Sequence, residues 1–407
     1  MRALLLVAAA CSLLMALPAR AADNYTFSFF NPLQAQQTNG YKTLDQFIAG
    51  LQDAASNQVF NFDLQLRGLG ATLGTDGPTF LTLNIPSLGV NQFFSANTPD
   101  ATFALLKAFL TQGSQAGAIA RESARVSPFD PVAGNPTSLM ARAVAFDFFT
   151  AFYPFASNIT DDNALIAQAG GGIPQGAVRG PFRSLPGIGA MYGNFHDQGL
   201  KTQSFTLPLT MTFRSDLDPR RQFSISLPLT VVDVDGARAY QGTLSGALRL
   251  PLARDWAITT AIGYSQVRAT ELGSAGQIGS AAVTSAYVFR TGYGDLALGN
   301  MIGYYRTLAG TINGITTDSK IGDTVFRNGL LWSEKAGWLG NGLTIEYSLI
   351  NTYYAGTALY NRNYTELGVS VGSNKRADSV RSYMQGGLAY LFSPKTKGLM
   401  ANYAYWF

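Results

Sequence analysis

Few residues in this chain have the types and the spacing that catalysis needs. Residues 368–372 read Gly-Val-Ser-Val-Gly, which matches the G-x-S-x-G pattern of a hydrolase nucleophile elbow. An elbow requires a strand-to-helix turn and a histidine base, but these five residues lie inside an alternating segment and the single histidine, His196, stands in a glycine-rich stretch. We therefore expect Ser370 to be a strand residue, His196 to be solvated, and the protein not to be an enzyme.

Motifs for cofactors and metal ions are equally weak. Gly68, Gly70 and Gly74 follow a predicted strand with the spacing G-x-G-x-x-x-G, and no helix begins there, so a hairpin explains them better than a dinucleotide loop. The chain has one histidine and one cysteine, Cys11, which excludes an imidazole-rich or thiolate metal site. The adjacent Asp161 and Asp162 are better suited to capping a helix than to holding calcium. We predict no cofactor and no metal.

The elements that position the remaining polar residues are strands. Beyond Leu200, apolar and polar residues alternate in eleven segments, a period-two pattern that predicts strands with two different faces. Each segment has about the ten residues that a tilted strand needs to cross a membrane. Because bacterial single-chain barrels have an even number of strands, we expect about twelve, within a range of roughly 10 to 14.

The last of these strands carries a resemblance. Its alternating aromatic residues Tyr403, Tyr405 and Phe407 resemble the C-terminal signal strand of bacterial outer-membrane β-barrels, which the barrel-assembly machinery reads. The resemblance implies a transmembrane antiparallel β-barrel over residues 201–407 in the outer membrane of a Gram-negative cell. Outer-membrane lipid and the assembly machinery would then be its partners. The resemblance identifies no subfamily, such as the porins, and no solute.

The N-terminal end and the composition agree with this location. Residues 1–21 have a basic start, a short apolar core and a small-x-small cleavage site, which predicts a secretory signal peptide whose removal would leave no cysteine. Charged residues make up only 13% of the chain, and the net charge is +4 without a basic patch. Nucleic acid is therefore not an expected partner.

Between the signal peptide and the barrel, residues 22–169 read as a small α+β domain. Helical spacing of apolar residues predicts helices at residues 43–56, at 99–110 and from Pro136 to a stop at Pro154. Alternation predicts a strand pair at 59–66 and 79–85. Residues 170–200 are so rich in glycine and proline that we expect a linker or an irregular plug there.

The predicted inner face of the barrel is lined by small residues. Such a lining leaves space that water, a solute or a plug must fill. A few larger polar side chains share this face and are our candidates for lining the lumen: Arg249, Arg290, Arg327, Glu346, Glu366 and Gln385. These charges could act as a weak filter, but both signs occur, which favours pairs that hold the barrel in shape.

Three functions fit these observations. In the first, the barrel is a pore or transporter whose N-terminal domain plugs it, gates it or docks to a partner. In the second, the layout is similar to that of an autotransporter, with the N-terminal domain displayed as cargo and the barrel as its anchor or export pore. The absence of a predicted polar linker helix in residues 170–193 counts against display. In the third, the barrel is a non-conducting anchor that binds a periplasmic or surface protein. The sequence indicates no oligomeric state.

Overall fold

The structure is a computed structural model that describes residues 23–30, 36–56, 61–157, 182–197, 199–215, 218, 220–339, 343–373 and 383–406. Several predicted features lie outside these residues. They are the signal peptide at 1–21, the pair Asp161–Asp162, most of the glycine-rich stretch before residue 182, and Phe407.

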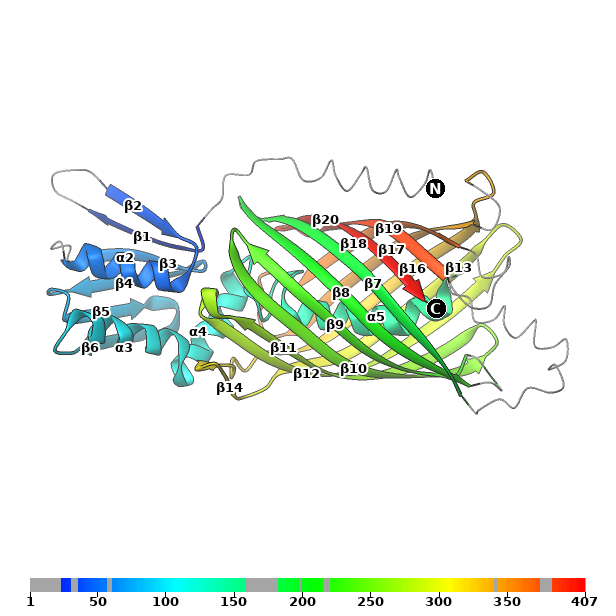
Figure 1. Ribbon diagram of the computed structural model, residues 1–407, viewed down its shortest axis with the longest axis horizontal. Coiled ribbons are helices and arrows are strands. Elements are labelled where there is room, and N and C mark those ends of the chain that lie inside the picture. Colours follow the sequence, from blue (N-terminus) through cyan, green and yellow to red (C-terminus); the bar gives the residue numbers. More distant parts are fainter. Residues whose placement is uncertain are drawn as a thin grey trace.

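The N-terminal part of the chain forms a six-stranded antiparallel sheet with helices packed on it (Figure 1). The helices pack on the sheet because alternate strand residues are apolar, as in β3, where every second side chain is buried. Phe27, Phe47 and Phe62 lie in this core. The strands, in the order β2-β1-β3-β4-β5-β6, are β1 (Tyr25–Phe30), β2 (Gln36–Tyr41), β3 (Asn61–Leu66), β4 (Leu69–Thr75), β5 (Phe80–Ile85) and β6 (Val90–Ser95).

In the described residues, four α-helices, together with one short 3-10 turn (Pro86–Leu88), belong to this half of the chain. They are α2 (Leu44–Ser56), α3 (Pro99–Thr111), α4 (Gly113–Val126) and α5 (Leu139–Ala156). Helix α3 begins where the sequence indicates, because Thr98 caps it and Pro99 occupies its first turn. None of the helices in the described residues is both long and apolar enough to cross a membrane.

Three local predictions for this region are wrong. The strands predicted at 59–66 and 79–85 are not neighbours, because β4 lies between β3 and β5 in the sheet. Its glycines, Gly70 and Gly74, hid it from the alternation pattern, although the tight β3–β4 turn at Arg67 and Gly68 is the expected hairpin. Helix α5 begins after the cap Ser138 rather than at Pro136, and it continues past Pro154.

The rest of the described chain forms a closed antiparallel barrel of twelve strands (Figure 1). The fold class and the strand number predicted from the sequence are therefore confirmed. The barrel strands are β7 (Phe182–Asp197), β8 (Leu200–Ser215), β9 (Gln222–Val234), β10 (Ala237–Ala253), β11 (Trp256–Ala269), β12 (Ser274–Arg290), β13 (Asp295–Thr307), β16 (Gly322–Lys335), β17 (Leu343–Gly356), β18 (Asn363–Ser373), β19 (Tyr383–Phe392) and β20 (Lys397–Trp406). The short strands β14 (Thr311–Ile312) and β15 (Ile315–Thr316) form a hairpin in the β13–β16 loop, and a second 3-10 turn (Thr270–Leu272) follows β11.

The strand that the sequence count missed is β7. It lies within residues 170–200, where we expected a linker or plug, so the barrel begins near residue 182 and not at 201. Glycines at 187, 189 and 193 interrupt its apolar pattern, which is why alternation did not reveal it. Pairing of β20 with β7, from Lys397–His196 to Trp406–Gly187, closes the barrel.

The two faces of the barrel wall differ as a membrane requires. Along β9, side chains alternate between buried and exposed, and the exposed ones are large and apolar, such as Phe223 and Leu229. The inner face carries small hydroxyl residues that bond between neighbouring strands. The hydroxyl oxygens of Thr206 and Thr230 lie 2.9 Å apart, and so do those of Thr243 and Ser265. An apolar outer face and a polar inner face identify a barrel that sits in lipid.

The sheet domain sits on one mouth of the barrel, at the end opposite the C-terminal end of β20 (Figure 1). Four barrel loops bond to it. The Asn24 amide donates to the Val234 carbonyl oxygen (3.1 Å) and the Tyr25 hydroxyl to that of Leu272 (2.7 Å). The backbone N–H of Gly113 donates to Thr316 Oγ1 (2.9 Å) and that of Tyr360 to the Ala124 carbonyl (2.9 Å). These bonds fix the domain as a cap on this mouth.

Burial at this contact shifts two acidic groups. Asp130, in the loop between α4 and α5, is fully buried and lies 3.4 Å from the Arg67 guanidinium. Burial raises the pKa of the Asp130 carboxyl, although Arg67 opposes the shift. Burial likewise raises the pKa of the Tyr25 hydroxyl to about 12, which keeps it protonated as a hydrogen-bond donor.

Candidate functional site: a lumen occupied by a helix

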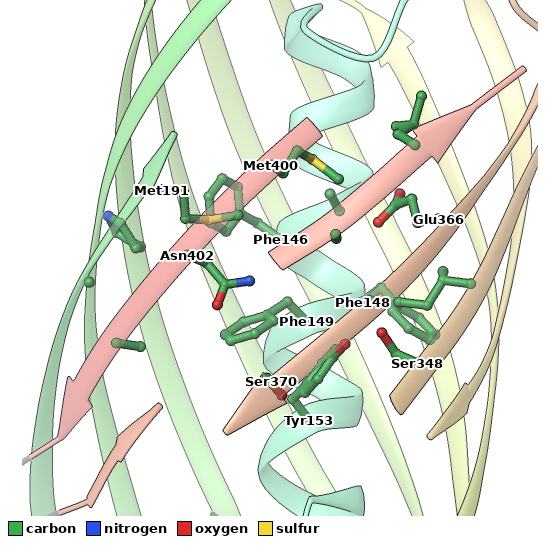
Figure 2. Close-up of a pocket in the computed structure, with 18 of the residues that line it drawn as sticks. Phe146, Phe148, Phe149, Tyr153, Met191, Ser348, Glu366, Ser370, Met400 and Asn402 are labelled. Carbon is green, nitrogen blue, oxygen red and sulfur yellow. The ribbon is translucent and has the colours of Figure 1, made fainter. Parts of the chain in front are cut away.

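Helix α5 lies inside the barrel (Figures 1 and 2). It packs against β10, β11, β12, β13 and β16, so it lies to one side of the lumen rather than on its axis. Twelve of its residues are buried, and the largest are aromatic: Phe146, Phe148, Phe152 and Phe155. The sequence predicted this helix as part of a separate domain, but the structure places it in the lumen.

Two glycines of the wall make room for the aromatic rings of α5. A Cβ atom on Gly299 of β13 would lie 2.5 Å from Cδ2 of Phe152. A Cβ atom on Gly329 of β16 would lie 2.8 Å from Cζ of Phe148. Real Cβ contacts are not this short, so each ring would have to move if its glycine were replaced. Because glycine has no side chain, Gly299 and Gly329 each leave room for one ring. We call these two positions the glycine seats of the helix.

Polar side chains along α5 bond to the wall at three levels. Near its start, Arg142 Nη1 donates to Thr206 Oγ1 of β8 (3.0 Å). At mid-helix, the Asp147 carboxylate accepts from the Tyr305 hydroxyl of β13 (2.8 Å). Just after its end, the Ser157 hydroxyl donates to Glu346 Oε1 of β17 (2.6 Å). Because each bond is directional and wholly or partly buried, together they fix the depth and the rotation of the helix.

Two of the predicted lumen residues form a pair beside α5. Arg327 of β16 bonds to Glu366 of β18, with Nη1 and Oε1 2.9 Å apart, and it also donates to Thr352 Oγ1 (2.5 Å). Its guanidinium carbon lies 5.3 Å from the centre of the Phe148 ring, which is cation–π distance. The two charges therefore hold each other and the helix.

The other four predicted lumen residues are spread along the barrel. Glu346 is buried and also accepts from the Ser333 hydroxyl (2.9 Å). Gln385 of β19 donates to Ser370 Oγ (2.9 Å). Arg290 bridges Asp255 (2.7 Å) and Asp295 (3.2 Å) at the mouth nearest the C-terminal end of β20. These four residues do not converge on one site.

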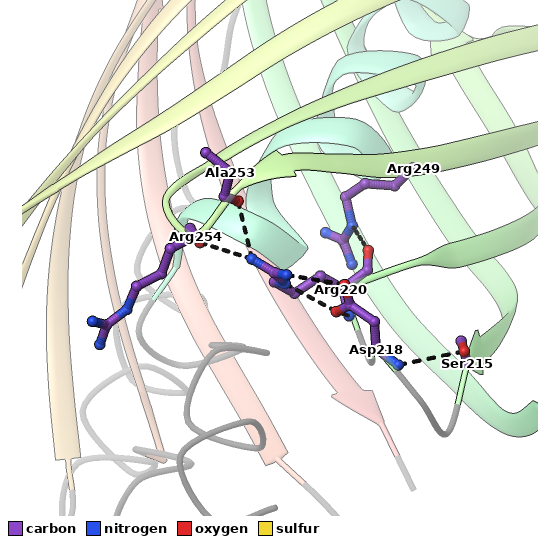
Figure 3. A network of polar contacts seen from close by, with 6 residues as sticks. All are labelled: Ser215, Asp218, Arg220, Arg249, Ala253 and Arg254. Atoms are coloured by element: carbon purple, nitrogen blue, oxygen red, sulfur yellow. Dashed lines mark hydrogen bonds and ion pairs between the residues drawn. The ribbon is translucent and has the colours of Figure 1, made fainter. Parts of the chain in front are cut away.

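Arg249 belongs to a network at this same mouth (Figure 3). Its Nε donates to the Arg220 carbonyl (3.1 Å), and its guanidinium lies 5.9 Å from the Phe155 ring of α5. Arg220 pairs with Asp218 (2.9 Å) and donates to the carbonyl oxygen of Ala253 (3.0 Å). The network ties the β8–β9 turn to the β10–β11 turn and to the end of the helix. Sequence analysis missed Arg220 because it lies in a turn.

The residues of the predicted assembly signal lie on β20. Tyr403 faces outward and is 44% exposed, and it pairs with Ala190 of β7. Tyr405 pairs with Ile188 on the same face, while Phe407 lies outside the described residues. The aromatic stripe thus runs along the strand that closes the barrel.

The residues weighed for catalysis do not meet. Ser370 lies within β18, which continues through residues 368–372 without the turn that an elbow needs. His196 is an exposed residue near the C-terminal end of β7. In the described part of the chain, no three metal-ligating side chains gather.

Comparison with solved structures finds outer-membrane barrels among the similar proteins. No protein-family model and no curated protein matches the chain. The translocator domain of the autotransporter NalP from Neisseria meningitidis is 11% identical, with 63% of this chain and 99% of that chain covered at a TM-score of 0.40. The β-domain of the Bordetella autotransporter BrkA is 13% identical (55% and 98% covered, TM-score 0.43). An outer-membrane channel from Pseudomonas putida F1 is 15% identical (58% and 99% covered, TM-score 0.40).

The class of the protein follows from its own geometry. A closed antiparallel barrel with an apolar outer face is the bacterial outer-membrane β-barrel fold, and this chain has it. The low identities and TM-scores select no subfamily.

The glycine seats give a direct test of the helix position. Replacing Gly299 by alanine adds one Cβ against Phe152, and we expect overpacking to lower the free energy of unfolding by about 1–3 kcal/mol. Urea titration of the purified barrel, followed by tryptophan fluorescence, measures the change. Gly386→Ala is the matched control, because a Cβ there would meet no atom closer than 3.9 Å. Equal effects of the two substitutions would contradict the seat.

Proposed function

We propose that this barrel is an outer-membrane anchor that holds its own N-terminal sheet domain at the cell surface. The observation that carries the proposal is the path of the chain. The sheet domain caps one mouth, α5 runs through the lumen, and β7 begins at the other mouth beside the C-terminal end of β20. In outer-membrane barrels the first strand begins and the last strand ends on the periplasmic side. The capped mouth, at the opposite end, would therefore face outward.

Loop lengths support this orientation in part. The longest described connection, the β13–β16 loop with its β14–β15 hairpin, lies at the capped mouth. The turns at Arg254 and Asp255 and at residues 291–294 lie at the other mouth and are tight. Extracellular loops are the longer ones in such barrels.

The sequence counted the lack of a polar linker helix in residues 170–193 against display. Helix α5, at residues 139–156, occupies the lumen instead and supports display by another route. Helix α5 lies before the glycine-rich stretch. It is apolar and aromatic, whereas the linker helix of an autotransporter layout would be polar. The hydrogen bonds between α5 and the wall support a permanent seal of the lumen, which favours an anchor over an open pore.

Export and assembly complete the proposal. Residues 1–21 would direct secretion, and the stripe of Tyr403, Tyr405 and Phe407 would present β20 to the assembly machinery in the outer membrane. Lipid contacts would come from the exposed apolar residues of the wall.

The proposal predicts which side of the membrane carries the domain. An epitope tag placed after Asp23 should be removed by protease added to intact cells, because the capped mouth would face the medium. A second tag in residues 374–382, the β18–β19 connection, is the control, and it should be cut only after the outer membrane is opened. Protection of the first tag on intact cells, with cleavage after permeabilisation, would rule out surface display.

A further inference from the structure

The off-centre position of α5 leaves a cavity on the other side of the lumen. Its volume is about 160 Å³, and it lies between the helix and strands β7, β18, β19 and β20 (Figure 2). The wall there includes small residues, among them Gly187, Gly189 and Ala404. At the seats on the opposite wall, glycine makes room for a ring of the helix, whereas here the small residues leave open space.

Much of the cavity wall is apolar, with several aromatic rings and two methionines. Phe146, Phe149 and Tyr153 of α5 line one side, and Met191 and Met400 line the other (Figure 2). Aromatic rings pack well against other rings, and thioether sulfur makes favourable contacts with ring edges. An engineered apolar cavity of about 150 Å³ binds benzene, so this volume suits one six-membered ring.

Several polar residues line the cavity. Arg327 and Glu366 bond to each other there, as do Gln385 and Ser370, and Asn402 of β20 adds an amide group. The Asn402 side chain points from β20 toward Phe149 in the cavity (Figure 2). Its amide can both donate and accept a hydrogen bond. A ring that carries a hydroxyl would satisfy this amide, whereas an unsubstituted ring would leave it without a partner from the ligand.

The wall beside the cavity is also weakly paired. The β7–β8 register runs to Ile188–Leu209 and resumes at Met191–Thr206. Pro208 lies in this interval and has no N–H to donate. Ile188 faces lipid, is 43% exposed and also lines the cavity, so only the thickness of the wall separates the cavity from the membrane at this residue.

We propose that this cavity binds a small aromatic molecule with one ring and one hydroxyl group, taken up from the lipid side. The proposal goes beyond surface anchoring and does not depend on which side the sheet domain faces. Of the two seated rings, Phe148 also lines the cavity and Phe152 does not.

Calorimetric titration of the full-length protein in detergent micelles tests this, with protein-free micelles as the blank. Phenol should bind saturably at one site per barrel, and more tightly than cyclohexanol or benzene. Ala404→Phe fills the cavity and should weaken phenol binding at least tenfold. Ala401→Phe, on the other face of the same strand, is the matched control and should bind phenol as the wild type does.

A second variant keeps the test decisive if Ala404→Phe does not fold. Asn402→Leu should weaken phenol binding and leave benzene binding unchanged, since it removes only the hydrogen-bonding group. Three results would overturn the proposal: no saturable phenol binding by the wild type, equal binding by Ala404→Phe and Ala401→Phe, or equal affinity for phenol and cyclohexanol.

Discussion

Deletion of residues 23–157 is expected to turn a barrel of low conductance into an open channel. The deletion removes the sheet domain and α5 and leaves all twelve barrel strands, since β7 begins at Phe182. With the helix gone, the inner face is lined by hydroxyl and small residues that water can wet. We expect single-channel conductance in a planar bilayer to rise about tenfold or more, as in barrels with an aqueous lumen.

A shorter deletion separates the cap from the helix. Removal of residues 23–126 takes away the sheet domain and α4 but keeps α5 and the loop before it, so conductance should stay low. Heat-dependent mobility on a gel would establish that both shortened barrels are folded. If the two deletions conduct alike, α5 is not the seal. A deletion extended to residue 195, as the linker predicted at 170–200 would have permitted, would destroy β7 and must be avoided.

Substitution of Arg327 by methionine is expected to destabilise the protein by about 3–5 kcal/mol. The Arg327 side chain is 4% exposed, and its guanidinium is held by Glu366 and Thr352. Its removal leaves the Glu366 carboxylate without its partner in a largely buried site, and it also removes the cation that lies against Phe148. Urea titration of the purified barrel measures the loss.

The double variant Arg327→Met/Glu366→Gln separates charge from packing. Because no unpaired carboxylate remains, it should recover a large part of the stability that Arg327→Met alone loses. Lys335→Met, at the end of the same strand, is the control and should change stability little. If the double variant is no more stable than Arg327→Met, the ion pair is not the source of the effect.

The barrel could be predicted from the sequence because most of its strands alternate apolar residues that face lipid with small polar residues that face the lumen. In β9, lipid faces one side and the lumen the other, so Phe223, Ile225 and Leu227 alternate with small polar residues. The rule fails for β7, where glycine supplies no side chain to read, and for β4, for the same reason. In both strands the neighbours determine the structure more than local propensity does.

The position of α5 could not be read from its own residues. Its apolar spacing predicts a buried helix but does not tell whether a domain core or a barrel lumen buries it. The information lies in its partners, because Gly299 and Gly329 stand at the two positions where Phe152 and Phe148 need room. A glycine within a strand has several explanations, so these seats became visible only with the helix in place.

The pairing of Arg327 with Glu366 was one of two readings that the sequence left open. Both residues were expected on the inner face, but β16 and β18 are not adjacent, and no short-range pattern relates them. The structure joins them across β17 and adds the Phe148 ring, which comes from a distant part of the chain.

The route of the chain through the lumen restricts the order in which the protein can be assembled. The sheet domain and the start of β7 lie at opposite mouths, and helix α5 occupies the channel that joins the two. A folded six-stranded sheet with its helices is far wider than one helix, so it cannot be threaded through the finished barrel. Under the proposed orientation, the sheet domain must therefore cross the outer membrane as an unfolded chain, or the seam between β20 and β7 must close around α5 after the domain has crossed.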